Sequence, residues 1–184
     1  MTIAIERVTR ASAAAAAAAL APVLIDTVES GASVGWIEPP TPDEATRWWS
    51  ALFADPDADS WIARDGGQAL GTITLVRAAK RNGPHRAEVI KLMVHRDARG
   101  RGIAPALMTA LEDFAAANGL TLLVLDTETG SLAESLYTRW GWQTVGGIPD
   151  YAVSPSGSLG GTTIMYKRLS SGRPLEPSGE RALA

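Results

Sequence analysis

A glycine-rich segment, Arg99-Gly100-Arg101-Gly102-Ile103-Ala104, separates an apolar strand-like run from a long helix-like run. Glycines at positions 100 and 102 let backbone N–H groups approach an anion without hindrance from a Cβ atom, and the positive end of the following helix points at the same place. The segment lacks a Walker lysine, which favours a site that holds a cofactor over one that cleaves a nucleotide. The sequence therefore predicts a strand–loop–helix unit with a diphosphate cradle.

The length and charge of the chain exclude several classes of protein. With 184 residues, the chain can form one domain with a sizeable core. We expect this domain to span residues 1–169, because residues 170–184 are rich in Gly, Pro, Ser and charge, which is typical of a flexible tail. A net charge of −3 argues against a nucleic-acid partner, which would require a clustered basic excess.

The chain contains no cysteine and only two histidines. Disulfides, thiolate metal sites and a cysteine nucleophile are therefore excluded. His85 and His95 do not make a histidine metal site by themselves, and no carboxylate spacing completes one, so we expect no metal cofactor. Neither histidine has an evident partner in the sequence, and both are expected on the surface.

An alanine-rich segment, residues 11–25, follows two arginines near the N-terminus. It is shorter than the roughly 18–20 residues that a membrane-spanning helix needs, and Pro22 interrupts it. Alanine has the highest helix propensity but is only weakly apolar, so the segment predicts an ordinary helix. We therefore expect a cytoplasmic protein without a membrane partner.

Hydrophobic periodicity predicts an α/β chain with the element order β-α-α-β-β-β-α-β-α-β-β. The expected helices cover residues 11–29, 42–54, 103–118 and 131–139. The expected strands cover residues 3–8, 60–63, 69–76, 86–95 and 120–125, a segment that begins at 141, and 162–169. Thr41 and Glu44 predict a helix cap, Asp65-Gly66-Gly67 predicts a hairpin turn, and residues 149–161 are expected to be a loop.

This order, with the glycine-rich loop after the fourth strand, resembles the GNAT superfamily of acetyl-CoA-dependent N-acetyltransferases. The family signature is Arg or Gln, two residues, Gly, one residue, then Gly or Ala, and Arg99, Gly102 and Ala104 meet it. Two further stretches resemble family motifs: Leu92-Met93-Val94, and Tyr137 followed by Gly141-Trp142. The resemblance implies a central, mixed, mostly antiparallel seven-stranded sheet with about four helices, in which the fourth and fifth strands form a splayed parallel pair.

The resemblance also implies that acetyl-CoA is the acetyl donor and assigns residues to it. Backbone groups at Leu92, Met93 and Val94 would contact the pantetheine arm and the thioester carbonyl. The segment from Arg99 to Ala104 would bind the diphosphate, with the two arginines neutralising phosphate charge. Many family members carry an asparagine that hydrogen-bonds the pantetheine arm, but this chain has Gly130 at that position. The Ser131 hydroxyl would take the place of the asparagine side chain. Glu134 and Tyr137, on the same helix as Ser131, are also assigned to the coenzyme.

Attack by an amine on a thioester needs a neutral amine, a stabilised oxyanion and a proton for the departing thiolate. Glu88 and Asp126 are candidates for the base, and the sequence leaves open which of them serves. Tyr137 occupies the position where the family places a general acid. Each has a structural alternative: Glu88 as an ion-paired strand residue beside Arg86 and Lys91, Asp126 as a turn cap, and Tyr137 as a core residue.

The acceptor and the residues that contact it are assigned from the family resemblance. Several stretches resemble family members that confer tabtoxin resistance by acetylating the amino group of a β-lactam toxin, among them residues 31–35, 86–94, 125–128 and 147–151. The resemblance implies a small-molecule amine as acceptor, contacted by Ser33, Trp36, Glu88, Asp126 and Tyr151, and antibiotic resistance or detoxification as a role. The alternatives are a non-catalytic acyl-CoA-binding sensor and a protein or peptide N-acetyltransferase. Members of the family commonly pair through the final strands, so the resemblance points to a homodimer as one option, and the sequence leaves the oligomeric state open.

Overall fold

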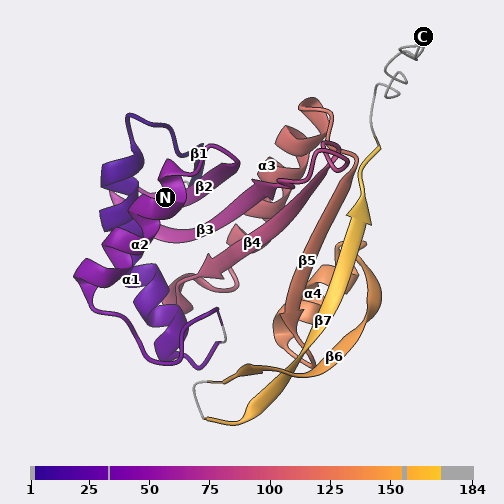
Figure 1. Cartoon of the computed structure of the whole chain (residues 1–184). Helices are drawn as coiled ribbons and strands as arrows, with labels where there is room; N and C mark the ends of the chain where they lie inside the picture. The colour runs from indigo at the N-terminus through magenta and orange to yellow at the C-terminus, as the bar shows by residue number, and fades with distance from the viewer. Residues whose placement is uncertain (1–2, 33, 155–156, 171–184) are drawn as a thin grey trace.

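One mixed β-sheet forms the centre of the protein, and helices pack on both of its faces (Figure 1). The computed structural model describes residues 3–32, 34–154 and 157–170, so the expected tail lies almost wholly outside the described residues. The strands are β1 (Ala4–Arg7), β2 (Ala58–Asp65), β3 (Gln68–Arg77), β4 (Arg86–Val94), β5 (Leu122–Glu128), β6 (Gln143–Val153) and β7 (Leu159–Arg168). The helices are α1 (Ala13–Glu29), α2 (Pro42–Ala54), α3 (Ile103–Ala117) and α4 (Leu132–Arg139), with a 3₁₀ turn, η1 (Arg96–Ala98).

The strand order across the sheet is β1-β2-β3-β4-β5-β7-β6. Every pairing is antiparallel except that of β4 with β5, which confirms the fold expected from the family resemblance. Helices α3 and α4 pack on one face, where the larger core includes Ile73, Leu75, Leu107, Leu111, Leu123 and Met165. Helices α1 and α2 pack on the other face through Leu20, Leu24, Trp49, Ile62 and Met93, and in Figure 1 they lie over the β1–β4 half of the sheet.

The last two strands are longer than the sequence predicts. The expectation of a loop over residues 149–161 is wrong, because β6 continues to Val153 and β7 begins at Leu159. The register slips between Ile148 and Ala152, so Pro149 lies where the ladder does not require its missing N–H. Every residue of β6 is exposed, so hydrophobic periodicity had no buried face to detect.

The local signals at α2 and at the β2–β3 turn are confirmed. The Thr41 hydroxyl accepts a hydrogen bond from the Glu44 N–H at 3.3 Å, and the Glu44 carboxylate accepts one from the Thr41 N–H at 2.8 Å. Pro42 occupies the first turn of α2, where its fixed φ suits a helix. Gly66, in the two-residue turn between β2 and β3, has φ +60°, as a tight hairpin requires.

The parallel pairing of β4 with β5 is short. Three residue pairs form it: Arg86 with Leu122, Ala87 with Leu123, and Glu88 with Val124. Beyond these pairs the strands separate, although β4 continues to Val94 and β5 to Glu128. The facing backbone edges of the two strands are therefore not paired with each other past Glu88, and they leave donors and acceptors for another partner.

A β-bulge in β4 accompanies this separation. Ile90 pairs with Thr74 of β3 and Met93 with Thr72, so Lys91 and Leu92 together face one residue of β3. Lys91 has φ +55°, a left-handed conformation that a long side chain seldom adopts. Because a bulge bends its strand and increases the local twist, it accounts for the divergence of β4 from β5.

A buried carboxylate ties α1 to the end of β4. Asp26, near the end of α1, accepts a hydrogen bond from the Arg96 N–H at 2.9 Å and another from the Arg96 guanidinium. The guanidinium also donates to the Asp26 carbonyl at 3.0 Å. His95 Nε2 lies 3.8 Å from the same carboxylate, so the expectation that His95 is a surface residue without a partner is wrong. The contact fixes where the segment leading to the glycine-rich loop leaves β4.

Replacing Asp26 with Asn should lower the free energy of unfolding by about 1–2 kcal/mol at pH 7, because a charge-assisted bond to a half-exposed arginine is lost. Burial opposes ionisation of Asp26, but the bonds from Arg96 outweigh it, so the pKa lies below the ordinary 3.8. The contribution is therefore fully present above pH 3.8 and lost as the pH falls through the folded-state pKa. Chemical unfolding of both proteins at pH 7 and pH 3 measures this, with Asp113→Asn, an exposed position on α3, as the control. An equal difference at both pH values would contradict the ionic contact.

Candidate active site

Two carboxylates lie where β4 and β5 part. Side chains alternate along both strands, and Ala87, Val89, Leu123 and Leu125 are buried in the core under α3 and α4. Glu88 and Asp126 are exposed on the opposite face, Glu88 in the last residue pair and Asp126 two residues beyond the partner of Glu88. The structure therefore brings together the two carboxylates singled out in the sequence, at the mouth of the gap.

The two carboxylates and Lys91 influence one another electrostatically. Partial burial raises the pKa of Glu88 above 4.5, the charge on Asp126 raises it further, and Lys91 opposes the shift. Burial lowers the pKa of Lys91, whereas Asp126 and Glu88 support its charged form. The Thr162 hydroxyl of β7 donates to Asp126 at 3.1 Å and orients that carboxylate. The raised pKa of Glu88 makes its carboxylate a better proton acceptor than an ordinary glutamate.

Lys91 belongs to the candidate site as well, although no motif in the sequence marks it. Its ammonium donates to the Val34 carbonyl at 2.8 Å and lies 5.3 Å from the centre of the Trp48 ring. It thus joins the bulge of β4 to the loop between α1 and α2. The sequence does contain one sign of this role, a lone lysine inside the apolar run of residues 89–94. A lysine in such a run is partly buried, and a partly buried ammonium group needs hydrogen-bonding or charged partners.

Tyr137 of α4 is buried in the larger core. Its ring packs edge-on against Trp140 at 5.9 Å and lies 5.8 Å from Trp142. Burial raises its pKa far above the ordinary 10, and the charge on Asp126 contributes in the same direction. The hydroxyl therefore keeps its proton at neutral pH. Core packing and a proton-donating role, the two interpretations of this residue, are compatible.

The glycine-rich loop leads into α3, and its two glycines adopt left-handed backbone conformations. Gly100 and Gly102 have φ of +77° and +75°, and a Cβ atom on either would meet no protein atom within 4 Å. The first helical hydrogen bond runs from Ala106 N–H to the Gly102 carbonyl, so the N–H groups of Ile103 and Ala104 precede it and Pro105 has none to lose. The arrangement suits a diphosphate, which would accept these bonds and face the positive helix end.

Both arginines of the loop have protein partners. The Arg99 guanidinium donates to Ser30 at 3.2 Å and to the Val94 carbonyl at 3.4 Å. The Arg101 guanidinium forms an ion pair of 2.8 Å with Asp65. Their role as phosphate ligands stays a prediction, and the contacts present here hold the shape of the loop.

Ser131 and Glu134, assigned to the coenzyme in the sequence, cap α4 in the structure. The Ser131 hydroxyl accepts a hydrogen bond from the Glu134 N–H at 3.2 Å, and the Glu134 carboxylate accepts one from the Gly130 N–H at 2.6 Å. Gly130 has φ +79°, the left-handed conformation that glycine adopts without strain. The three residues therefore position α4, and with it Tyr137.

Of the residues expected on the acceptor side, Ser33 lies outside the described residues. Trp36 is half-buried against the core beneath α1 and α2, and Tyr151 on β6 is 54% exposed.

Within the described ranges, no cluster of His, Asp and Glu side chains could hold a metal ion. The helices of the described part are all too short or too polar to cross a membrane.

Comparison with known proteins agrees with this arrangement. The family model described as the acetyltransferase (GNAT) family matches residues 24–142, which run from α1 to Trp142. The chain is 31% identical over 143 residues to an uncharacterized N-acetyltransferase of Azospirillum brasilense encoded between hisH and hisA, covering 70% of this chain and 85% of that protein.

Two solved structures with acetyl-CoA share the fold. The Salmonella typhimurium protein YncA has a TM-score of 0.76 at 18% identity, covering 96% of this chain and 99% of the other. A phosphinothricin acetyltransferase from Sinorhizobium meliloti has a TM-score of 0.75 at 20% identity, covering 97% and 94%. With the open loop before α3 and the gap between β4 and β5, the family match shows that the chain belongs to the acetyltransferase (GNAT) family and is an acetyl-CoA-dependent N-acetyltransferase.

Proposed function

We propose that the protein moves an acetyl group from acetyl-CoA to the primary amine of a small, amino-acid-like molecule in the cytoplasm, by direct transfer in a ternary complex. The observation that carries the proposal is the pair of carboxylates, Glu88 and Asp126, at the mouth of the gap between β4 and β5. Carboxylates attract an ammonium group, and Glu88, with its raised pKa, can take a proton from it. The absence of cysteine agrees with transfer without an acyl-cysteine intermediate.

Each residue then has a defined task. Glu88, directly or through a water molecule, removes one proton from the ammonium, and Asp126 holds the amine with the help of Thr162. Unpaired backbone N–H groups of β4 near Val94 are suited to stabilise the oxyanion that forms when the nitrogen attacks the thioester carbon. As the tetrahedral intermediate collapses and the C–S bond breaks, the Tyr137 hydroxyl is suited to protonate the departing thiolate, and the second proton lost by the nitrogen returns to the tyrosine oxygen through solvent.

For the acceptor, we propose a compound of the type of tabtoxinine-β-lactam, which would make the protein a resistance or detoxification enzyme. The stretches that resemble tabtoxin-resistance members include residues 86–94 and 125–128, which carry Glu88 and Asp126. The test is an acceptor screen that follows release of free coenzyme A thiol, with tabtoxinine-β-lactam, common amino acids, polyamines and peptides. Saturable acetyl-CoA binding without amine-stimulated thiol release would favour a sensor module, and activity confined to peptides would favour a peptide acetyltransferase.

We also propose that β6 pairs with a second copy of the chain. This edge strand is exposed throughout, and large apolar side chains protrude from it and from the start of β7: Val145, Ile148, Tyr151, Val153 and Leu159. An exposed apolar edge strand favours association with another chain. Light scattering should give twice the chain mass of 19.3 kDa, and Ile148→Glu should give the single mass. A wild-type protein of single mass at assay concentrations would contradict the dimer.

Glu88→Gln should lower kcat by roughly 10²–10⁴-fold without changing acetyl-CoA affinity, because the base is lost. In the wild type, kcat/KM should rise with pH through a pKa above 4.5, since Glu88 accepts a proton only in its ionised form. The variant should lose this limb of the pH profile. Glu128→Gln, an exposed position on the same strand as Asp126, is the matched control and should behave as the wild type. If the limb persists in Glu88→Gln and disappears in Asp126→Asn, Asp126 is the base.

Tyr137→Phe should lower kcat on the order of 10²-fold while the Kd for acetyl-CoA stays the same, because the proton donor is removed and the ring remains. Packing against Trp140 and Trp142 is retained, so the thermal midpoint should change little. Steady-state kinetics, calorimetry with acetyl-CoA and thermal unfolding measure the three quantities. Unchanged kcat would leave Tyr137 with a packing role only.

A further inference from the structure

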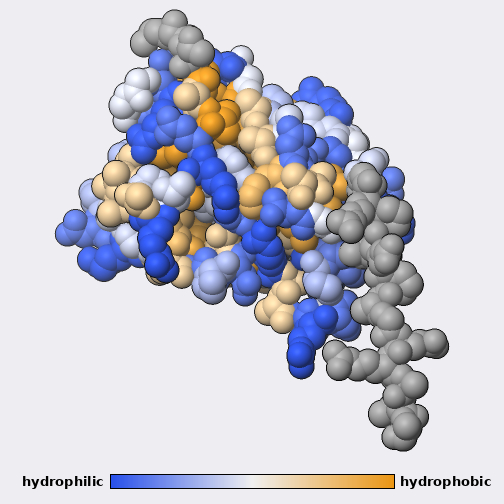
Figure 2. Space-filling view, turned by 90° about the horizontal axis from the view of Figure 1, so that it is seen from above, coloured by the Kyte–Doolittle hydropathy of each residue, from blue (hydrophilic) through white to orange (hydrophobic). Residues whose placement is uncertain are grey.

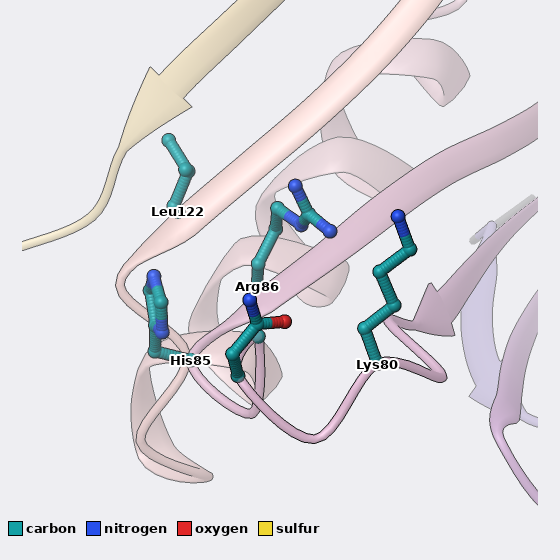
Figure 3. Close-up of a pocket in the computed structure, with 6 residues that line it drawn as sticks. Lys80, His85, Arg86 and Leu122 are labelled. Atoms are coloured by element: carbon teal, nitrogen blue, oxygen red, sulfur yellow. The ribbon is translucent and has the colours of Figure 1, made fainter.

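A second group of polar side chains lies at the start of β4, away from the gap. Residues of the β3–β4 turn and the first residues of β4 and β5 enclose a hollow of about 240 Å³, lined by Lys80, Asn82, Gly83, His85, Arg86 and Leu122. Figure 2 views the molecule from the end of the sheet where β4 and β5 begin, and hydrophilic residues cover much of that surface. In Figure 3, Lys80 and Arg86 extend in the same direction from the two sides of the turn.

This hollow lies on the same face of the sheet as the two carboxylates. Arg86 and Glu88 are two residues apart on β4, with buried Ala87 between them, so both side chains point to the face opposite α3. Their partners on β5, Leu122 and Val124, point to the same face, with the buried Leu123 between them. Two residues of a strand span roughly 7 Å, which sets the separation along β4 between the hollow and Glu88.

The hollow is positively charged, and no acidic side chain lines it. Among the described residues, neither Arg86 nor Lys80 forms an ion pair or a side-chain hydrogen bond. Arg168 of β7 lies opposite Leu122 and adds a third cation to the same row of the sheet. A negative region and a positive region thus lie side by side on one open surface.

We propose that the hollow binds an anionic group of the acceptor, a carboxylate in the case of an amino acid. The inference rests on the proposed function, since it places the acceptor amine at Glu88 and Asp126. The acceptor would then be a zwitterion whose amine and carboxylate lie on the order of 7 Å apart. The Arg86 guanidinium presents a planar pair of N–H donors that matches a carboxylate, and Asn82 and Lys80 offer further donors.

The arrangement also rejects particular amines. A diamine bound through one ammonium at Glu88 would place its second ammonium against Arg86 and Lys80, an unfavourable pair of like charges. An acceptor amine that carries no anionic group would leave the Arg86 guanidinium without a partner. The hollow therefore selects zwitterions whose two charges are well separated, such as ω-amino acids, over polyamines.

The test uses three acceptors of equal length: 5-aminopentanoate, 5-aminopentanamide and 1,5-diaminopentane. In the wild type, kcat/KM for the carboxylate should exceed that for the amide at least tenfold, and the diamine should be the poorest. Arg86→Met should remove this preference by raising KM for the carboxylate, with kcat/KM for the amide unchanged within about twofold. Arg86→Lys should restore part of the preference, because it keeps the charge and loses the planar donor pair.

Arg81→Met is the matched control, since Arg81 is an exposed arginine of the same turn that does not line the hollow. Equal kcat/KM for carboxylate and amide in the wild type, or a preference that survives Arg86→Met, would overturn the inference and leave the acetyltransferase proposal intact. If no amine stimulates thiol release from bound acetyl-CoA, the proposed function itself fails and the subsite fails with it.

Discussion

The proposed active site depends on backbone hydrogen bonds that two neighbouring strands do not form. β4 and β5 pair over three residues and then separate, because a bulge at Lys91 and Leu92 bends β4 away. A regular parallel sheet would satisfy these groups internally and leave no room between the strands. The separation leaves backbone donors and acceptors of both strands without a partner in the sheet, and a thioester carbonyl and a polar coenzyme arm could bind to them.

Other contacts hold this opening in place from both sides. Lys91, strained into a left-handed conformation at the bulge, reaches the Val34 carbonyl and connects β4 to the loop between α1 and α2. Asp26 of α1 binds Arg96, the second residue after β4, and fixes the direction in which the chain enters the glycine-rich loop. Capping of α4 by Ser131 and Glu134 places Tyr137 on the far side of β5. The site is thus built on rigid elements rather than on free loops.

The sequence was informative wherever structure depends on near neighbours. The cap at Thr41, the hairpin at Gly66 and the strand–loop–helix unit around Gly102 each follow from a few adjacent residues, and together with the family motifs they were enough to predict the fold. The β6–β7 hairpin was missed because a strand exposed on both faces has no hydrophobic period and contains Pro149 at a register shift.

The partners of charged residues were harder to predict, since they lie far along the chain. His95 lies beside Asp26, which is 69 positions earlier, and Arg101 binds Asp65 rather than standing free beside the cradle. Glu88 and Asp126 could be paired in advance because the family resemblance supplied the strand order that brings them together. The bulge that positions Lys91 results from a shift in the pairing of β3 with β4, and no local pattern in the sequence predicts that shift.

Calorimetry on two glycine variants measures whether the backbone around Gly102 and the gap beyond it hold acetyl-CoA. Gly102 and Gly119 lie at opposite ends of α3, with φ of +75° and +77°, and a Cβ on either meets no atom within 4 Å. Valine at each position imposes the same backbone strain, and only the one at 102 fills the cradle. Gly102→Val is expected to abolish acetyl-CoA binding, whereas Gly119→Val is expected to bind with the wild-type Kd. Equal affinity in the two variants would contradict it.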